Sequence, residues 1–178
     1  EDAVATAPEI GLALLADGMG GYNAGEVASN MAISITEHAM ARWFAQAGTT
    51  PTTSDVRKAL QESVQEANLA VLNTALQQPQ CAGMGTTLVA AVFLQDRLVL
   101  GHMGDSRCYR LRDGQLQQIT RDHSLVSDLV ENGTITQEQA RTHPRKNVLM
   151  RAVGVEVGLP VVEPVEAHDV EPQPLLGR

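Results

Sequence analysis

The order of the apolar segments is the feature that most constrains the fold of this chain. A continuous apolar run at residues 10–18 predicts a short buried β-strand, and two long segments with helical periodicity follow it, at 26–48 and 49–79. Residues 86–124 then return to short β-type runs. Because single strands and helices do not alternate, a parallel βαβ sheet is disfavoured. We therefore expect an α+β fold in which helices cover antiparallel sheets.

Local signals set the expected limits of the two long helices. Gly48 is expected to stop the first helix, and Ser54 to cap the second, which Pro79 closes. The apolar face of the first helix is expected to consist of Val27, Met31, Ile35, Met40, Trp43 and Phe44. The corresponding face of the second is expected to consist of Val56, Leu60, Val64, Ala67, Val71 and Leu72.

The second half of the chain carries strong turn signals. The dipeptide Asp113-Gly114 predicts a tight hairpin turn, so the runs around it are expected to form an antiparallel meander. A short helix is expected at residues 124–132, and a capping box of Thr136 and Gln139 predicts another.

Composition bounds the class of protein. The chain has 178 residues, of which 43% are hydrophobic and 19% charged, as in an ordinary globular domain. Its formal net charge is −8, and the sequence shows no cluster of Lys and Arg. A general binder of nucleic acid or of an anionic membrane needs a basic face, so neither partner is expected.

The sequence also indicates a compartment. No apolar run reaches the length of a membrane span, and no signal peptide is visible. The two cysteines, Cys81 and Cys108, lack metal or redox spacing; a disulfide between them stays open, but a reducing cytoplasm fits better. The chain starts at Glu1 rather than Met and turns proline-rich at its end. We expect a cytoplasmic protein of which this chain is a piece.

Asp17 raises the first question of function. It ends the apolar run "IGLALLADG", and a carboxylate in that place is costly unless it is paired or bound to a metal. Gly18 lets a cation approach the backbone, so its carbonyl could join the Asp17 side chain as an oxygen ligand of Mg²⁺ or Mn²⁺. A simple Asp-Gly turn is the alternative. A phosphate-binding loop is discounted because "GMGGYNAG" has neither the glycine spacing nor the lysine.

Asp105 repeats this design in a second place. The aliphatic run "RLVLGHM" ends in Gly-Asp, and two strand-end carboxylates could meet and share divalent ions. A turn between strands is the alternative. His102, just before, is expected to be a packed or hydrogen-bonded residue rather than a ligand.

Five motifs, taken together and in order, resemble the bacterial branch of the metal-dependent Ser/Thr protein phosphatases of the PPM (PP2C-type) family. They are "ED", "ADGMGGYNAGEVAS", "GMGTTLVAAV", "GHMGDSRCYRLRDGQLQQITRDHS" and "HPRKNVLMRAVG". The resemblance covers nearly the whole chain. It implies a single domain over residues 1–178, built as two stacked antiparallel β-sheets flanked by pairs of antiparallel helices.

The resemblance also implies a binuclear Mn²⁺ or Mg²⁺ centre that activates water to hydrolyse phosphoserine and phosphothreonine. By position, Asp17 would bridge the two metals, and Glu1 and the Gly18 carbonyl would bind one of them. Asp2 would act beside them through metal-bound water, and Asp105 matches the aspartate of a third, weaker metal site. Residues 125–147 match a mobile flap near the substrate entrance.

Some family residues are missing from this chain. The phosphate-contacting arginine of the family lies before Glu1, and the two later metal-binding aspartates lie in motifs that do not occur here. We therefore expect an active parent protein and an impaired chain.

Three functions stay open at this point. The first is a monomeric phosphatase that acts on phosphorylated proteins and opposes bacterial Ser/Thr kinases. The second is a non-catalytic, phosphatase-like regulatory or binding module. The third is the related branch that dephosphorylates anti-sigma-factor antagonists.

Overall fold

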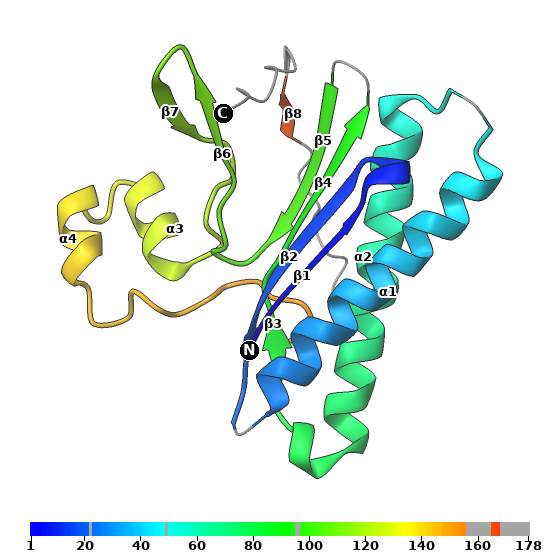
Figure 1. The fold of residues 1–178 in the computed structure, drawn as a ribbon. Coiled ribbons are helices and arrows are strands. Elements are labelled where there is room, and N and C mark those ends of the chain that lie inside the picture. Colours follow the sequence, from blue (N-terminus) through cyan, green and yellow to red (C-terminus); the bar gives the residue numbers. More distant parts are fainter. Residues whose placement is uncertain (22, 49, 95–96, 156–164, 168–178) are drawn as a thin grey trace, which may run out of the picture.

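One antiparallel sheet organises the molecule (Figure 1). The computed structural model describes residues 1–21, 23–48, 50–94, 97–155 and 165–167. Within them the six-stranded sheet has the order β1-β2-β4-β5-β8, and β3 pairs with β2 off this path. Its strands are β1 (Asp2–Ala7), β2 (Leu12–Met19), β3 (Gly85–Thr86), β4 (Leu88–Leu94), β5 (Arg97–Met103) and β8 (Val165–Ala167).

Two long helices, α1 (Ala24–Gln46) and α2 (Thr53–Gln77), pack on one face of this sheet (Figure 1). The chain then forms a separate two-stranded hairpin and two short helices on the other side. These elements are β6 (Tyr109–Arg112), β7 (Gln115–Gln118), α3 (Leu125–Glu131) and α4 (Gln137–Thr142). Two 3₁₀ turns, η1 (Pro8–Ile10) and η2 (Pro79–Cys81), complete the described elements. The expected α+β fold is confirmed.

The main core lies between the sheet and the two long helices. Alternate residues of a strand point to the same face, so one set from each strand meets the helices. The buried set comprises Leu12, Leu14 and Ala16 of β2, Leu88, Ala90 and Val92 of β4, and Val56, Leu60, Val64 and Val71 of α2. The apolar face expected for α2 is therefore correct, with Leu72 half-buried at its edge.

The apolar face expected for α1 is only partly correct. Met40 is fully buried, but Val27 is 36% exposed. The helix instead buries small residues, among them Ala28, Ser29 and Ala32, because it is wedged between the sheet and α2. A helix that packs closely on two sides accommodates only small side chains there. Hydrophobic periodicity does not indicate how closely a helix is packed.

The start of α2 differs from the expectation. Ser54 is not its cap; Thr52 is, in a complete capping box with Asp55. The Thr52 side chain accepts a hydrogen bond from the Asp55 backbone N–H, and the Asp55 carboxylate accepts one from the Thr52 backbone N–H. An acidic residue three positions after Thr52 completes this reciprocal pair, which Ser54 cannot form. Gly48 does stop α1, with φ of 76°.

The later turn signals are mostly confirmed. Asp113 and Gly114 have φ of 50° and 73° and join β6 to β7 in a tight hairpin. Ser124 caps α3, and Thr136 with Gln139 forms the expected capping box of α4. The continuous meander is wrong within the described residues: β4 pairs with β5, but β6 and β7 form their own sheet.

The described residues also bear on the expectations about a membrane span and about the end of the chain. No helix of the described residues is long and apolar enough to cross a membrane. The proline-rich end expected from the sequence lies almost entirely outside the described residues.

Candidate metal centre

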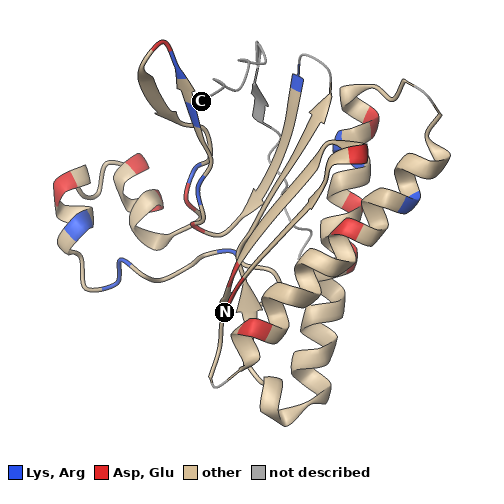
Figure 2. Ribbon diagram, in the orientation of Figure 1, with Lys and Arg blue, Asp and Glu red and all other residues tan. Residues whose placement is uncertain are grey.

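The predicted acidic residues gather at one end of the sheet. Asp2, which begins β1, is the cross-strand partner of Asp17, near the end of β2. Figure 2 shows these acidic positions side by side near the N-terminus. Residues directly opposite in an antiparallel pair have Cβ atoms about 5 Å apart, so the two carboxylates lie next to one another.

The backbone of Asp17 is fixed by the strand that follows α2. Its N–H donates to the Thr87 hydroxyl at 2.9 Å, and its carbonyl accepts from the Thr87 N–H at 2.9 Å. The Thr86 hydroxyl donates to the same carbonyl at 2.9 Å. Thr87 also shares a hydrogen bond with Ser106 at 2.7 Å, which ties this region to the loop of Asp105.

Glu1 lies over the glycines at the start of α1. Its backbone carbonyl accepts from the Gly18 N–H at 3.2 Å and from the Ser29 hydroxyl at 2.6 Å. A Cβ atom on Gly18 would lie 2.0 Å from the Gly25 carbonyl oxygen, and one on Gly25 would lie 3.1 Å from a Glu1 carboxylate oxygen. The glycines are thus required because β2, Glu1 and α1 approach one another closely.

The carboxylates at this end repel one another. Partial desolvation raises the pKa of Asp17, and the negative charges of Asp2, Asp105 and Glu1 raise it further. A cluster of carboxylates that resists full ionisation is the arrangement a divalent cation relieves.

Asp105 enters the same cavity from a different loop. Asp17 and Asp105 both line a cavity of about 310 Å³, together with Thr87, Asn147 and Arg151. Gly104, with φ of 99° and Thr87 against its α-carbon, makes the turn that presents Asp105. The two strand-end carboxylates therefore face one space, as the sequence predicted.

The residues fit a metal in chemistry but do not form a closed cage. Among the described residues, no three His, Cys, Asp or Glu side chains are close enough together to make a metal site. The oxygen donors that do converge are those preferred by hard cations such as Mg²⁺ and Mn²⁺. The structure thus places Asp2 across from Asp17 on the neighbouring strand, and Asp105 with Asp17 at one cavity, in an open arrangement.

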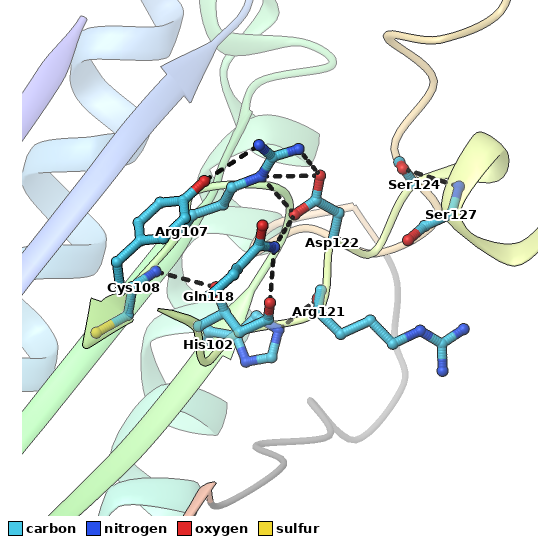
Figure 3. A network of polar contacts seen from close by, with 10 residues as sticks. His102, Arg107, Cys108, Gln118, Arg121, Asp122, Ser124 and Ser127 are labelled. Carbon is cyan, nitrogen blue, oxygen red and sulfur yellow. Dashed lines mark hydrogen bonds and ion pairs between the residues drawn. The ribbon is translucent and has the colours of Figure 1, made fainter. Parts of the chain in front are cut away.

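A polar network joins Arg107, two residues after Asp105, to the segment before α3 (Figure 3). The Arg107 guanidinium donates two hydrogen bonds to the Asp122 carboxylate, at 2.8 and 2.6 Å, and this contact raises the pKa of Arg107. Buried His102 stacks on His123 with ring centroids 4.5 Å apart and donates from Nε2 to the Arg121 carbonyl at 2.7 Å. The expectation that His102 is a packed, hydrogen-bonded residue is confirmed.

His123 joins this loop to the segment after α4. Its Nδ1 accepts from the Gly104 N–H at 3.2 Å, and its carbonyl accepts from the Met150 N–H at 2.8 Å. Beyond Arg151, Val153 exchanges backbone hydrogen bonds of 2.9 and 3.0 Å with Thr86. The backbone of Arg151 is therefore anchored on both sides at the edge of the cavity.

Sequence reasoning missed several residues of the site. The motif "GMGTTLVAAV" was noted without a role for Thr87, although the Thr87 hydroxyl holds the Asp17 backbone. No individual role was predicted for Asn147 or Arg151, which line the same cavity. A polar pair directly after a glycine turn was the available signal for Thr87. No local signal placed Arg151 in the cavity, because its position depends on contacts more than sixty residues apart in the chain.

Comparison with known proteins places this arrangement in a family. The family described as protein phosphatase 2C matches residues 1–158. The chain belongs to the protein phosphatase 2C family. The expected bacterial PPM-type family is thereby confirmed.

Bacterial members of the protein phosphatase 2C family are similar to the chain throughout. The serine/threonine phosphatase stp of Listeria innocua is 43% identical over 145 residues, which are 82% of this chain and 56% of that protein. The serine/threonine protein phosphatase PstP of Mycobacterium tuberculosis is 40% identical over 161 residues, 90% of this chain and 27% of that protein. The chain thus spans about half the length of the Listeria relative.

A solved structure shows metals in one such relative. The catalytic domain of PstP, determined in complex with two manganese ions, superposes with a TM-score of 0.73 at 39% identity. The match covers 94% of this chain and 66% of that domain. The α+β architecture is accordingly that of protein phosphatase 2C domains, present here in part.

Proposed function

We propose that the protein containing this chain is a metal-dependent serine/threonine phosphoprotein phosphatase. The observation that supports this most is the convergence of Asp2, Asp17 and Asp105 on one end of a protein phosphatase 2C sheet. The proposed cofactors are two Mn²⁺ or Mg²⁺ ions, with a possible third at Asp105.

Each acidic residue has a proposed place in that centre. Asp17 would hold both metals, and Glu1 and the Gly18 carbonyl would hold one of them. Asp2 would act from beside them, and Asp105 would hold the third ion. When bound, such ions lower the pKa of a coordinated water and neutralise charge on the phosphoryl oxygens.

The residues of the chain supply the positioning. Thr86 and Thr87 keep the Asp17 backbone in place by three hydrogen bonds, so the backbone that carries this carboxylate does not need to move when a cation binds. Arg151 lines the same cavity and makes no hydrogen bond or ion pair with the described residues. We propose that its guanidinium binds the phosphoryl oxygens of the substrate, for which its planar donor geometry is suited.

The wider setting is also a proposal. The substrates would be proteins phosphorylated on serine or threonine by kinases that this enzyme opposes, with residues 125–147 acting as a flap beside the cavity. A monomer in the cytoplasm is proposed, and the two free cysteines fit a reducing compartment.

A non-catalytic module is the competing function, because the described residues lack a closed metal site. The second competing function is that of the related branch, which dephosphorylates anti-sigma-factor antagonists. Preserved strand-end carboxylates favour the enzyme, since a binding module has no need of mutually repelling charges.

The test is hydrolysis of a phosphothreonine peptide by the complete protein that contains this chain, with Mn²⁺ and with EDTA. The wild type is expected to act only with Mn²⁺, and Asp17→Ala to lower kcat at least about a hundredfold. Arg151→Gln is expected mainly to raise KM, and Arg112→Gln, on the distant hairpin, serves as its control. Equal rates for Asp17→Ala and the wild type would exclude the proposed centre.

A further inference from the structure

A second cavity adjoins the proposed metal centre. It has a volume of about 340 Å³ and lies between the α3–α4 segment and the loop of Arg107. Asp105 and Asn147 line both this cavity and the one that holds Asp17. The two cavities are therefore neighbours, with these two residues in the wall of both.

The charges around the second cavity are unusual for this chain. Arg107 is neutralised by its two-pronged contact with Asp122. Arg141 and Lys146 also line the cavity, and the side chain of neither makes a hydrogen bond or ion pair with the described residues. Figure 2 shows basic positions on α4 and on the coil that follows it. Asp105 is the one carboxylate of the lining without a cationic partner among the described residues, so the two basic side chains still leave the lining with an excess of positive charge in a chain of formal net charge −8.

The apolar walls of the cavity strengthen the attraction of these charges for an anion. Val126, Val130 and Ala140 line it and are buried or half-buried. Charges beside apolar walls act through a lower effective dielectric than charges on an open surface, so an anion there is attracted more strongly.

We propose that this cavity is a subsite for an acidic side chain of the phosphoprotein substrate, next to the phosphorylated residue. The inference rests on the proposed function, because it assumes that the phosphoryl group occupies the neighbouring cavity of Asp17. An extended chain advances about 3.5 Å per residue, so a Glu or Asp one or two positions away reaches the adjoining space. Arg141 and Lys146 would bind that carboxylate, and the enzyme would prefer acidic sequences around the phosphorylation site.

The experiment compares binding of two peptides by the complete protein. Each carries a non-hydrolysable phosphonate analogue of phosphoserine, flanked on both sides by two Glu residues in one peptide and by two Gln residues in the other. Fluorescence anisotropy with Mn²⁺ gives the two Kd values. The wild type is expected to bind the Glu peptide about fivefold more tightly, a preference that decreases as salt is raised.

Variants assign the preference to the cavity. The double variant Arg141→Gln with Lys146→Gln is expected to lose the preference and still bind the Gln peptide like the wild type. Lys58→Gln, which removes an exposed charge on α2, is the matched control and is expected to keep it. Equal Kd values for the two peptides on the wild type, no binding of either, or an unchanged preference in the double variant would overturn the inference.

Hydrolysis of the matching phosphoserine peptides, measured in parallel, separates the two proposals. Hydrolysis without a preference for the Glu peptide in binding would overturn the subsite and leave the phosphatase. A preference without hydrolysis would support the subsite and count against the phosphatase.

Discussion

Asp17 is a residue that the fold makes costly to ionise. The strand around it removes part of its solvent, and three other carboxylates lie near enough to raise its pKa. A raised carboxyl pKa means that the charged form destabilises the folded state. Three hydrogen bonds nevertheless fix the Asp17 backbone at this position. A carboxylate that is unfavourable to ionise and is held on a fixed backbone is the arrangement expected of a cation-binding site.

This gives a pH-dependent prediction for Asp17→Asn in the metal-free chain. Below the unfolded pKa of aspartate, about 3.9, Asp17 is protonated in both the folded and the unfolded state and does not affect the free energy of unfolding. As pH rises from there through the higher folded pKa, the Asp17 charge increasingly destabilises the folded state. Because Asp17 is exposed, solvent screens much of this cost. Asp17→Asn is therefore expected to raise Tm by no more than about 2 °C at pH 7 with EDTA, and to have no effect near pH 3. Thermal unfolding followed by circular dichroism measures both; a lower Tm for the variant at pH 7 would contradict this.

Gly18 is predicted to be irreplaceable for a steric reason. An added Cβ would lie 2.0 Å from the Gly25 carbonyl oxygen and 2.8 Å from that of Glu1, both backbone atoms that cannot move aside alone. Gly18→Ala is expected to lower the free energy of unfolding by about 2 kcal/mol. Gly21→Ala, where nothing lies within 4 Å of the new atom, is the control and should change it little. Urea denaturation distinguishes them, and equal effects would refute the close approach.

At the scale of elements, capping chemistry decides where α2 begins. Thr52→Ala removes both hydrogen bonds of the Thr52 hydroxyl in the capping box and is expected to lower Tm by about 3 °C. Ser54→Ala, one position inside the helix, is expected to leave Tm nearly unchanged. Thermal unfolding of the two variants checks this, and a larger loss for Ser54→Ala would restore the cap expected from the sequence.

Elements with strong local signals were predictable, and those set by packing were not. The strand that contains Asp17, the Asp113-Gly114 turn and the cap at Thr136 depend on residues near in sequence. The buried face of α1 depends on how closely the sheet and α2 approach it, which sequence periodicity does not encode. The separation of β6 and β7 from the main sheet is likewise a long-range outcome.

At the scale of the molecule, the two long helices stabilise the sheet and the loops form the candidate site. α1 and α2 cover one face of the sheet and hold the strands in place. The other face is covered in part by the region of the hairpin, where Cys108 and Ile119 pack on Leu98 and Leu100. The functional end is made where strand ends, the Asp105 loop and the segment after α4 meet.

The candidate site was predictable to a corresponding degree. Sequence motifs placed Asp17 and Asp105 at strand ends, and the structure has both facing one cavity. Arg151 and the cationic second cavity could not be predicted, because they arise where α4 and the following coil fold back onto the Asp105 loop. The individual metal roles of Glu1, Asp2, Asp17, Gly18 and Asp105 stay predictions.

The central claim is that the acidic strand ends bind divalent metal. Titration of Mn²⁺ into the 178-residue chain by isothermal calorimetry, for the wild type and for Asp17→Ala, tests it most directly. The account predicts saturable binding to the wild type and a loss of affinity of at least about tenfold in the variant. Equal Mn²⁺ affinity in the two proteins, or none in the wild type, would contradict it.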